Sequence, residues 1–125
     1  MIMRPSDNSS IELTHRVIFI SGQLGLYHAE LARILHLQCA DIGRLTGGKA
    51  LLEPATVAWR QAQRLSDFYN LLVERLDGDD VAIYHWLRAR NEFMEVEPLL
   101  MIVDHDQLEA VIRLLQSGIT IRQER

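Results

Sequence analysis

Hydrophobic residues recur at intervals of three and four positions along most of this chain. That spacing places side chains on one face of an α-helix, whereas the period of two that is typical of strands is scarce. The pattern therefore predicts an all-α protein of about seven helices. The expected helices cover 11–20, 28–36, 39–46, 53–77, a segment that starts at Asp79 or Asp80, 99–103, and a last segment after Asp104.

Two short apolar patterns separated by a break lie between Leu26 and Leu45. Leu31, Ile34 and Leu35 fall on one helical face, and Ile42 and Leu45 repeat the three-residue step after the break. Two short helices joined by a tight turn are typical of a helix-turn-helix, whose second helix can lie in the major groove of DNA. The segment therefore indicates a nucleic-acid target as well as a fold.

Helix ends are marked by particular residues. Ser10 is the expected N-cap of the first helix, Gly47 or Gly48 the expected end of the third, and Pro54 the expected first turn of the long helix. Asp104 and Gln107 form a capping-box pattern before the last helix. The buried face of that helix is expected to be Leu108, Val111, Ile112 and Leu115, and that of the preceding 79–88 segment Val81, Tyr84 and Leu87.

The long helix has a strict apolar seam at alternating steps of four and three. Such a seam is typical of coiled coils, and a second apolar strip (Val57, Phe68, Leu71) runs beside it. The helix is therefore predicted to bury one strip in its own domain and to offer the other to a second copy of the chain. An internal role in a helical bundle is the alternative. The predicted dimerisation residues are Leu65, Tyr69, Leu72 and Leu76.

Four parts follow from these elements: a flexible tail (1–10), a helix-turn-helix domain (11–52), a long connecting helix (53–78) and a small helical module (79–125). The net charge is −4, but residues 1–65 carry +2 and residues 66–125 carry −6. Such an asymmetry indicates two roles, since the first half is better suited to meet phosphate than the second. Ordinary solvated surface charge is the alternative.

No constellation of residues predicts catalysis or a cofactor. The one cysteine, Cys39, excludes an internal disulfide and fits a reducing, cytoplasmic location; it is expected to be an inert, at least half-buried thiol. His36 and Cys39 resemble half of a zinc site, but no second pair has the required spacing. Asp104-His105-Asp106 is better explained by a helix start than by acid–base chemistry. No signal peptide and no membrane span are expected.

Residues 26–45, with Gly47 and Lys49, resemble the Xre-type helix-turn-helix of phage-repressor-like regulators. Trp86-Leu87-Arg88, Asn91 and Pro98-Leu99-Leu100 resemble the toxin-binding domain of Xre/MbcA/ParS antitoxins. The resemblance implies a non-enzymatic antitoxin that represses its own operon as a dimer and sterically blocks a toxin, typically an NAD-degrading or ADP-ribosylating enzyme. The implied partner-binding residues are Trp86, Asn91 and Pro98. A stand-alone regulator, or an adaptor that has lost DNA binding, are the alternatives.

Within the motif, the candidate DNA contacts are Gln38, Ala40, Asp41, Arg44 and Lys49. Arg44 suits a guanine edge or a phosphate, and Lys49 suits a phosphate. Several positions depart from the family pattern, because Tyr27 and His28 replace a hydroxyl residue and a glutamine, and His36 replaces the glycine of the turn. Asp41 places a carboxylate where phosphate would repel it, and Gly43 costs about 1 kcal/mol of helix propensity.

Overall fold

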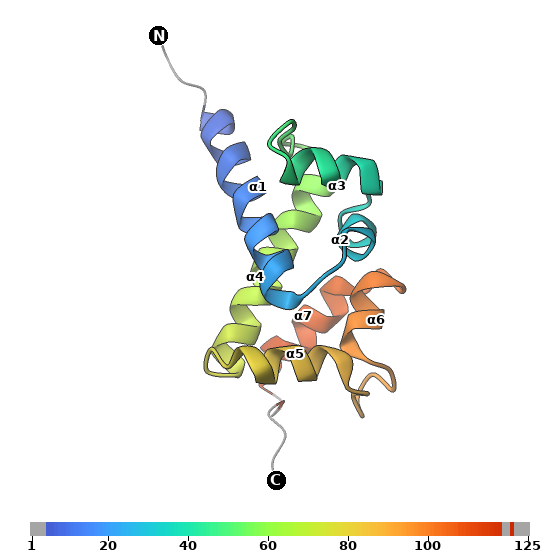
Figure 1. Ribbon diagram of the computed structural model, residues 1–125. Coiled ribbons are helices and arrows are strands. Elements are labelled where there is room, and N and C mark those ends of the chain that lie inside the picture. The colour runs from blue at the N-terminus through green and yellow to red at the C-terminus, as the bar shows by residue number, and fades with distance from the viewer. Residues whose placement is uncertain (1–4, 119–120, 122–125) are drawn as a thin grey trace. The chain divides into compact units, whose positions relative to one another are not determined.

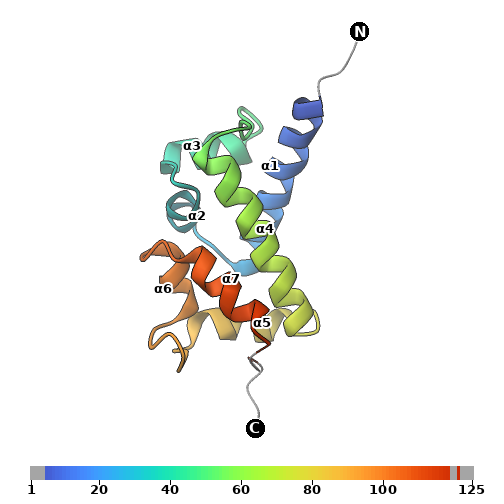
Figure 2. The same ribbon diagram turned by 180° about the vertical axis from the view of Figure 1, so that it is seen from behind.

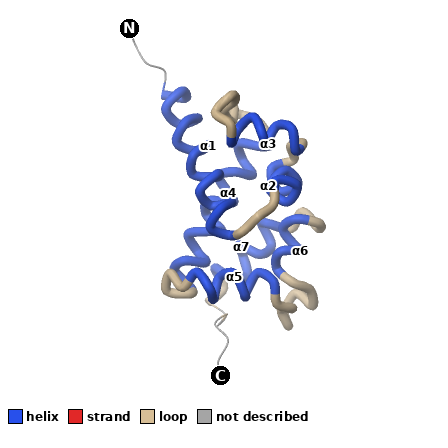
Figure 3. Tube along the Cα trace, viewed as in Figure 1, coloured by secondary structure: helices blue, strands red, loops and turns tan. Residues whose placement is uncertain are grey.

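The protein is all-α within the part that the structure describes. The computed structural model describes residues 5–118 and 121, with side chains from residue 8 onward. These residues form helices and loops without a strand (Figure 3), and no helix among them is long and apolar enough to cross a membrane. The seven helices within these residues are α1 (Pro5–Leu24), α2 (His28–Leu35), α3 (Cys39–Thr46), α4 (Val57–Arg75), α5 (Asp80–Arg88), α6 (Pro98–Val103) and α7 (Leu108–Gln116).

The chain divides into two compact units inside α4. Unit 1 is Met1–Ser66 and unit 2 is Asp67–Arg125. The sequence-based boundaries at 52/53 and 78/79 followed the ends of the long helix, whereas the structural division assigns each half of that helix to a different unit. Because Ser66 is uncharged, the units carry the same +2 and −6 as the two halves of the sequence.

Unit 1 contains α1, α2, α3 and the first half of α4 (Figure 1), and α3 packs against both α1 and α2. Three side-chain hydrogen bonds hold these elements together. Leu52 N donates to Thr14 Oγ1 (2.9 Å), Gln61 Nε2 donates to the carbonyl of Ile34 (2.9 Å), and Arg16 Nε donates to Ser66 Oγ (3.3 Å). The buried apolar residues of unit 1 include Val17, Ile20, Leu24, Leu31, Ile34, Leu35, Ile42, Leu52, Ala62 and Leu65.

The first helix is longer than predicted. It starts at Pro5, so the expected tail is wrong for residues 5–10, while residues 1–4 lie outside the described part. Ser10 is not an N-cap but a buried residue of the helix interior, as are Thr14 and Ser21. These small polar residues share a face with Val17, so the buried face of α1 is only partly apolar. The spacing of apolar residues alone therefore underestimates the length of this helix.

Unit 2 contains the second half of α4 with α5, α6 and α7, and α6 packs against both α5 and α7 (Figure 2). The Arg75 guanidinium donates to the carbonyl of Leu115 and thereby joins α4 to α7. The Phe68 and Trp86 rings lie 6.5 Å apart between centroids. The predicted buried face of the last helix is confirmed, and the other buried residues include Phe68, Leu72, Leu76, Ile83, Leu87 and Ile102.

The start of the long helix also differs from the prediction. Pro54 lies in a turn before the helix, and Thr56 caps it: its hydroxyl accepts from Trp59 N (3.1 Å) and donates to the carbonyl of Glu53 (2.7 Å). At the other end α4 stops at Arg75, and Asp77 and Gly78 have φ angles of 55° and 70°. Thr56 can cap the helix because its hydroxyl accepts from a backbone N–H of the first turn, whereas the proline side chain has no acceptor.

In unit 2, the predicted helix start at Asp79 or Asp80 is confirmed, because α5 begins at Asp80. Asp79 caps it, since its Oδ1 accepts from Ala82 N at 3.0 Å. Asp104 does not cap the last helix, because it lies directly after α6, and α7 starts only at Leu108. The predicted face of α5 is also partly wrong. Val81 and Tyr84 are 66% and 46% exposed, and the buried residues of this helix are Ile83, Trp86 and Leu87.

Candidate nucleic-acid interface

The turn between α2 and α3 is built around a left-handed residue. His36 has φ 60° and ψ 40°, and Leu37 N donates back to the carbonyl of Ala32 at 2.8 Å. This bond closes the end of α2 in the way that a C-terminal glycine usually does. A non-glycine residue in this conformation costs about 1–2 kcal/mol, so the packing of α2 against α3 holds a turn that the local sequence disfavours.

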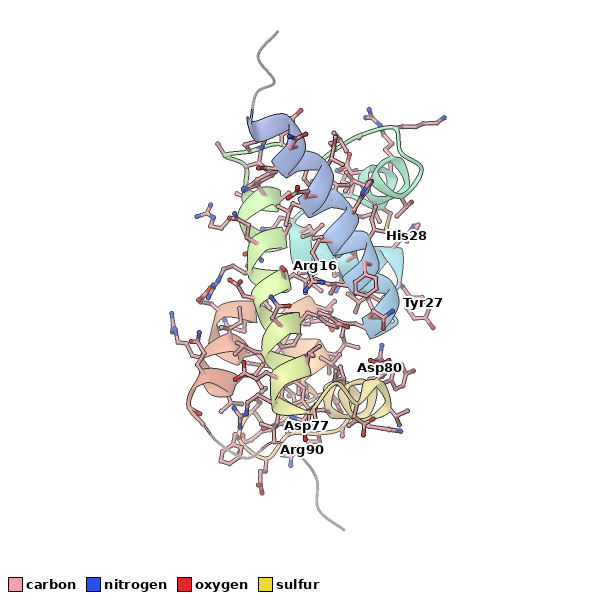
Figure 4. The ribbon with its side chains drawn as sticks, turned by 90° about the vertical axis from the view of Figure 1, so that its left-hand side faces the viewer. Arg16, Tyr27, His28, Asp77, Asp80 and Arg90 are labelled. Atoms are coloured by element: carbon pink, nitrogen blue, oxygen red, sulfur yellow. The ribbon has the colours of Figure 1, made fainter. Side chains whose placement is uncertain are left out.

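Both helices of this pair begin with the same hydrogen bond. Tyr27 N donates to Glu30 Oε1 (2.8 Å), and Gln38 N donates to Asp41 Oδ2 (3.0 Å). Each bond is the reciprocal half of a capping box, in which an acid three residues after the cap satisfies a free backbone N–H. Tyr27 and His28 are exposed beside the start of α2 (Figure 4).

Asp41 therefore has a structural function at the start of α3. Its carboxylate satisfies a backbone donor and lies at the positive end of the helix dipole. Its role as a DNA contact stays a prediction, because the bond to Gln38 N engages only one of the two carboxylate oxygens. The signal was present in the sequence, because an acid three residues after a helix start is half of the capping-box pattern.

The remaining candidate contacts lie on the exposed side of α3 or in the residues that flank it. Ile42 and Leu45 are buried against the rest of unit 1, whereas Gln38, Ala40, Arg44 and Lys49 are exposed. Lys49 N donates to the carbonyl of Arg44 at 2.8 Å, which brings these two basic residues to the same end of the helix.

The candidate metal ligands give no site. Cys39 is exposed at the first position of α3, so the expectation of a half-buried or buried thiol is wrong. In the described part of the chain, no three or more His, Cys, Asp or Glu side chains gather in an arrangement that would hold an ion.

The residues implied as partner contacts are used inside unit 2. Trp86 is only 7% exposed, and Pro98 is buried at the start of α6. Asn91 organises the next loop: its Oδ1 accepts from Phe93 N (2.8 Å) and Met94 N (3.2 Å), and its backbone pairs with Val96. For Trp86 and Pro98 the prediction of a partner surface needs correction, because both residues belong to the core. For Asn91 a partner contact stays a prediction.

The predicted dimerisation residues are also buried. Leu65, Tyr69, Leu72 and Leu76 are 0%, 8%, 0% and 1% exposed within a single chain. They fill the cores of the two units, so the seam is explained by internal packing, which was the alternative interpretation. A coiled-coil spacing and a bundle-core spacing share the same period, and the sequence alone does not separate them.

A cavity that the sequence did not predict lies between α3, the segment 50–53 and the start of α4. Its volume is about 310 Å³, and all its lining residues belong to unit 1. We call it the α3 pocket. Its apolar lining is Leu37, Leu45, Ala50, Leu51, Leu52, Val57 and Ala58. Leu51 and Val57 are exposed in this lining. Sequence motifs for catalysis or ligand binding do not identify them, because both side chains are purely apolar.

No protein-family model and no curated protein matches this chain. The resemblance to Xre/MbcA/ParS antitoxins therefore stays a prediction, as does the Xre-like arrangement of the first helices. The interpretation of the interface rests on the geometry of α2, α3 and the residues around them.

Proposed function

We propose that this protein is a helix-turn-helix regulator that binds DNA through α3. The observation that carries the proposal is the contact of α2 with α3 across a tight left-handed turn. The apolar side of α3 is buried, and Gln38, Ala40 and Arg44 remain exposed on the other side. In helix-turn-helix proteins the second helix enters the major groove with such an exposed side toward the bases.

The charges of unit 1 support the same proposal. Arg44 and Lys49 are exposed, and their side chains have no hydrogen bond or ion pair within the described residues. The net charge of +2 is small, so phosphate attraction depends on a few positions. Arg44 is the stronger candidate because its guanidinium pairs with a guanine edge or with a phosphate.

The test measures binding of the purified full chain to DNA from upstream of its own gene at several salt concentrations. Arg44→Ala is expected to weaken specific binding by about tenfold or more, the usual effect of losing a base contact. Arg60→Ala is the matched control, since Arg60 is exposed on α4 and outside the α3 surface. Equal affinities of Arg44→Ala and the wild type would refute the proposal.

A second function is favoured by the surface of unit 2. The unit carries −6, and three large hydrophobic side chains are strongly exposed: Val81 (66%), Phe93 (56%) and Tyr84 (46%). Exposed apolar residues among acidic ones suit a basic protein partner. We propose that this partner is a toxin, as the antitoxin resemblance implies, and that unit 2 covers its active site.

Co-expression with the product of the neighbouring gene tests the antitoxin function. The full chain is expected to restore growth and to co-purify with the toxin, and the double variant Tyr84→Asp/Phe93→Asp is expected to do neither. Leu51→Asp is the matched control, because Leu51 is similarly exposed (44%) but belongs to unit 1. Full protection by the double variant would show that this surface is not the toxin-binding site.

A further inference from the structure

The α3 pocket has the size and lining of a small-molecule site. Its volume of about 310 Å³ is at the lower end of the range for ligand pockets, roughly 300–1,000 Å³. Such pockets are mostly apolar and contain a few polar groups that orient the ligand. The α3 pocket combines its leucine-rich wall with four residues that carry ionisable side chains: His36, Asp41, Arg44 and Glu53.

Two of these charged groups make no polar contact with another residue that the structure describes. The Asp41 carboxylate accepts from Gln38 N and so already has a structural role. The side chains of Arg44 and Glu53 make no hydrogen bond or ion pair with any other described residue. The pocket therefore offers one cation and one anion, both unpaired, beside an apolar wall.

We propose that the α3 pocket binds a small zwitterion with an apolar side chain, such as a free aliphatic α-amino acid. A carboxylate matches the fork of the Arg44 guanidinium, and an ammonium group matches the Glu53 carboxylate. The apolar side chain of the ligand lies against Leu45, Leu52 and Val57. A simple carboxylic acid leaves Glu53 unpaired, and a simple amine leaves Arg44 unpaired.

The ligand also has a consequence for DNA binding. Arg44 lies both in the pocket lining and on the exposed side of α3. A carboxylate bound to Arg44 competes with a base or phosphate for the same guanidinium. This consequence rests on the proposed DNA-binding function, whereas occupation of the pocket does not.

The experiment is a titration of the isotope-labelled full chain with L-leucine, followed by NMR of the methyl and amide signals. Matched probes are 4-methylpentanoate, which lacks the amine, 3-methylbutylamine, which lacks the carboxylate, and glycine, which lacks the apolar side chain. We expect saturable shifts for Leu45, Leu52 and Val57 with leucine. Each analogue is expected to bind at least about tenfold more weakly, because it leaves a charged group unpaired or the wall uncovered.

Variants separate the pocket from its surroundings. Arg44→Gln is expected to bind leucine no more tightly than 3-methylbutylamine. Glu53→Gln is expected to bind leucine no more tightly than 4-methylpentanoate. Arg60→Gln is the control and is expected to bind leucine with the affinity of the wild type. Absence of saturable leucine shifts at millimolar concentration, or equal affinity for all four probes, would overturn the proposal. If leucine binds the pocket but the chain binds no DNA, the site stands and the proposed DNA-binding function fails.

Discussion

The two units of this chain differ in the charges that they present. Unit 1 carries +2 and places Arg44 and Lys49 together at one end of α3, whereas unit 2 carries −6 and exposes apolar side chains between its acids. The net charge of −4 for the whole chain conceals this contrast. Average charge is therefore a poor guide to a partner when a chain contains two units, because each surface attracts ligands according to its own charge.

The two units share one helix, α4. The first half of α4 belongs to unit 1 and the second half to unit 2, although the helix is continuous. Leu65 and Leu72 occupy equivalent seam positions, both fully buried, but they lie in different units. The difference teaches that one regular apolar pattern can serve two separate cores.

The largest expected effects come from truncating these two leucines. Leu65→Ala and Leu72→Ala are each expected to lower the free energy of unfolding by about 2–5 kcal/mol, because each opens a cavity in a packed core. Hydrogen exchange is expected to show the loss of protection mainly in unit 1 for Leu65→Ala and mainly in unit 2 for Leu72→Ala.

Chemical denaturation at several protein concentrations gives the control for these variants. If the seam were a dimer interface, the wild-type midpoint would rise with concentration and the alanine variants would lose that dependence. A concentration-independent midpoint for all three proteins agrees with burial within one chain.

The next largest loss of stability is expected from a change in the loop of unit 2 that Asn91 organises. Asn91→Ala removes the acceptor of two backbone N–H groups, those of Phe93 and Met94. At about 0.5–1.5 kcal/mol for each hydrogen bond, the expected loss of unfolding free energy is about 1–3 kcal/mol. Asn91→Asp retains the acceptor and is the matched control. An unchanged stability of Asn91→Ala would contradict the role of this side chain in organising the loop.

Much of this fold follows from local patterns in the sequence. The two short helices α2 and α3, the start of α5 at Asp79 or Asp80, the start of α6 near Pro98 and the buried face of α7 were predicted from spacing and end residues. Such features depend on neighbours within a few positions, so the sequence contains their physical cause. The boundary inside α4 depends on which distant elements pack against each half, and local periodicity does not contain that information.

The candidate sites were predicted less well than the helices. Arg44 and Lys49 are exposed as a contact requires, but Trp86 and Pro98 are buried. Large apolar residues serve equally as interface anchors and as core, and a small unit needs most of them for its own core. The α3 pocket was missed because its walls come from α3, a loop and α4, and no short motif joins those three segments.

Replacing one glycine in each unit by alanine is expected to change the free energy of unfolding by a smaller amount, with opposite signs in the two units. Gly43 in α3 and Gly78 after α4 both have open space where a Cβ would lie, but only Gly78 has a positive φ (70°). Gly43→Ala is expected to raise the free energy of unfolding by about 1 kcal/mol through helix propensity. Gly78→Ala is expected to lower it by about 1–2 kcal/mol, because alanine disfavours left-handed backbone. Thermal unfolding of both variants measures the two signs, and equal signs would contradict the backbone assignment.

The smallest expected effect on stability comes from removing the charge of the acid at the start of α2 or of α3. Asp41→Asn and Glu30→Gln both keep a side-chain acceptor but remove a charge from a helix start, so each is expected to lower the free energy of unfolding by only about 0.3–1 kcal/mol. Only Asp41→Asn is expected to strengthen DNA binding, since it removes a carboxylate from the helix that we propose enters the groove. Glu30→Gln is the matched control for the cap, with unchanged affinity. If both variants bind DNA alike, α3 is not the helix that approaches the phosphates, and the proposed interface must lie elsewhere in the chain.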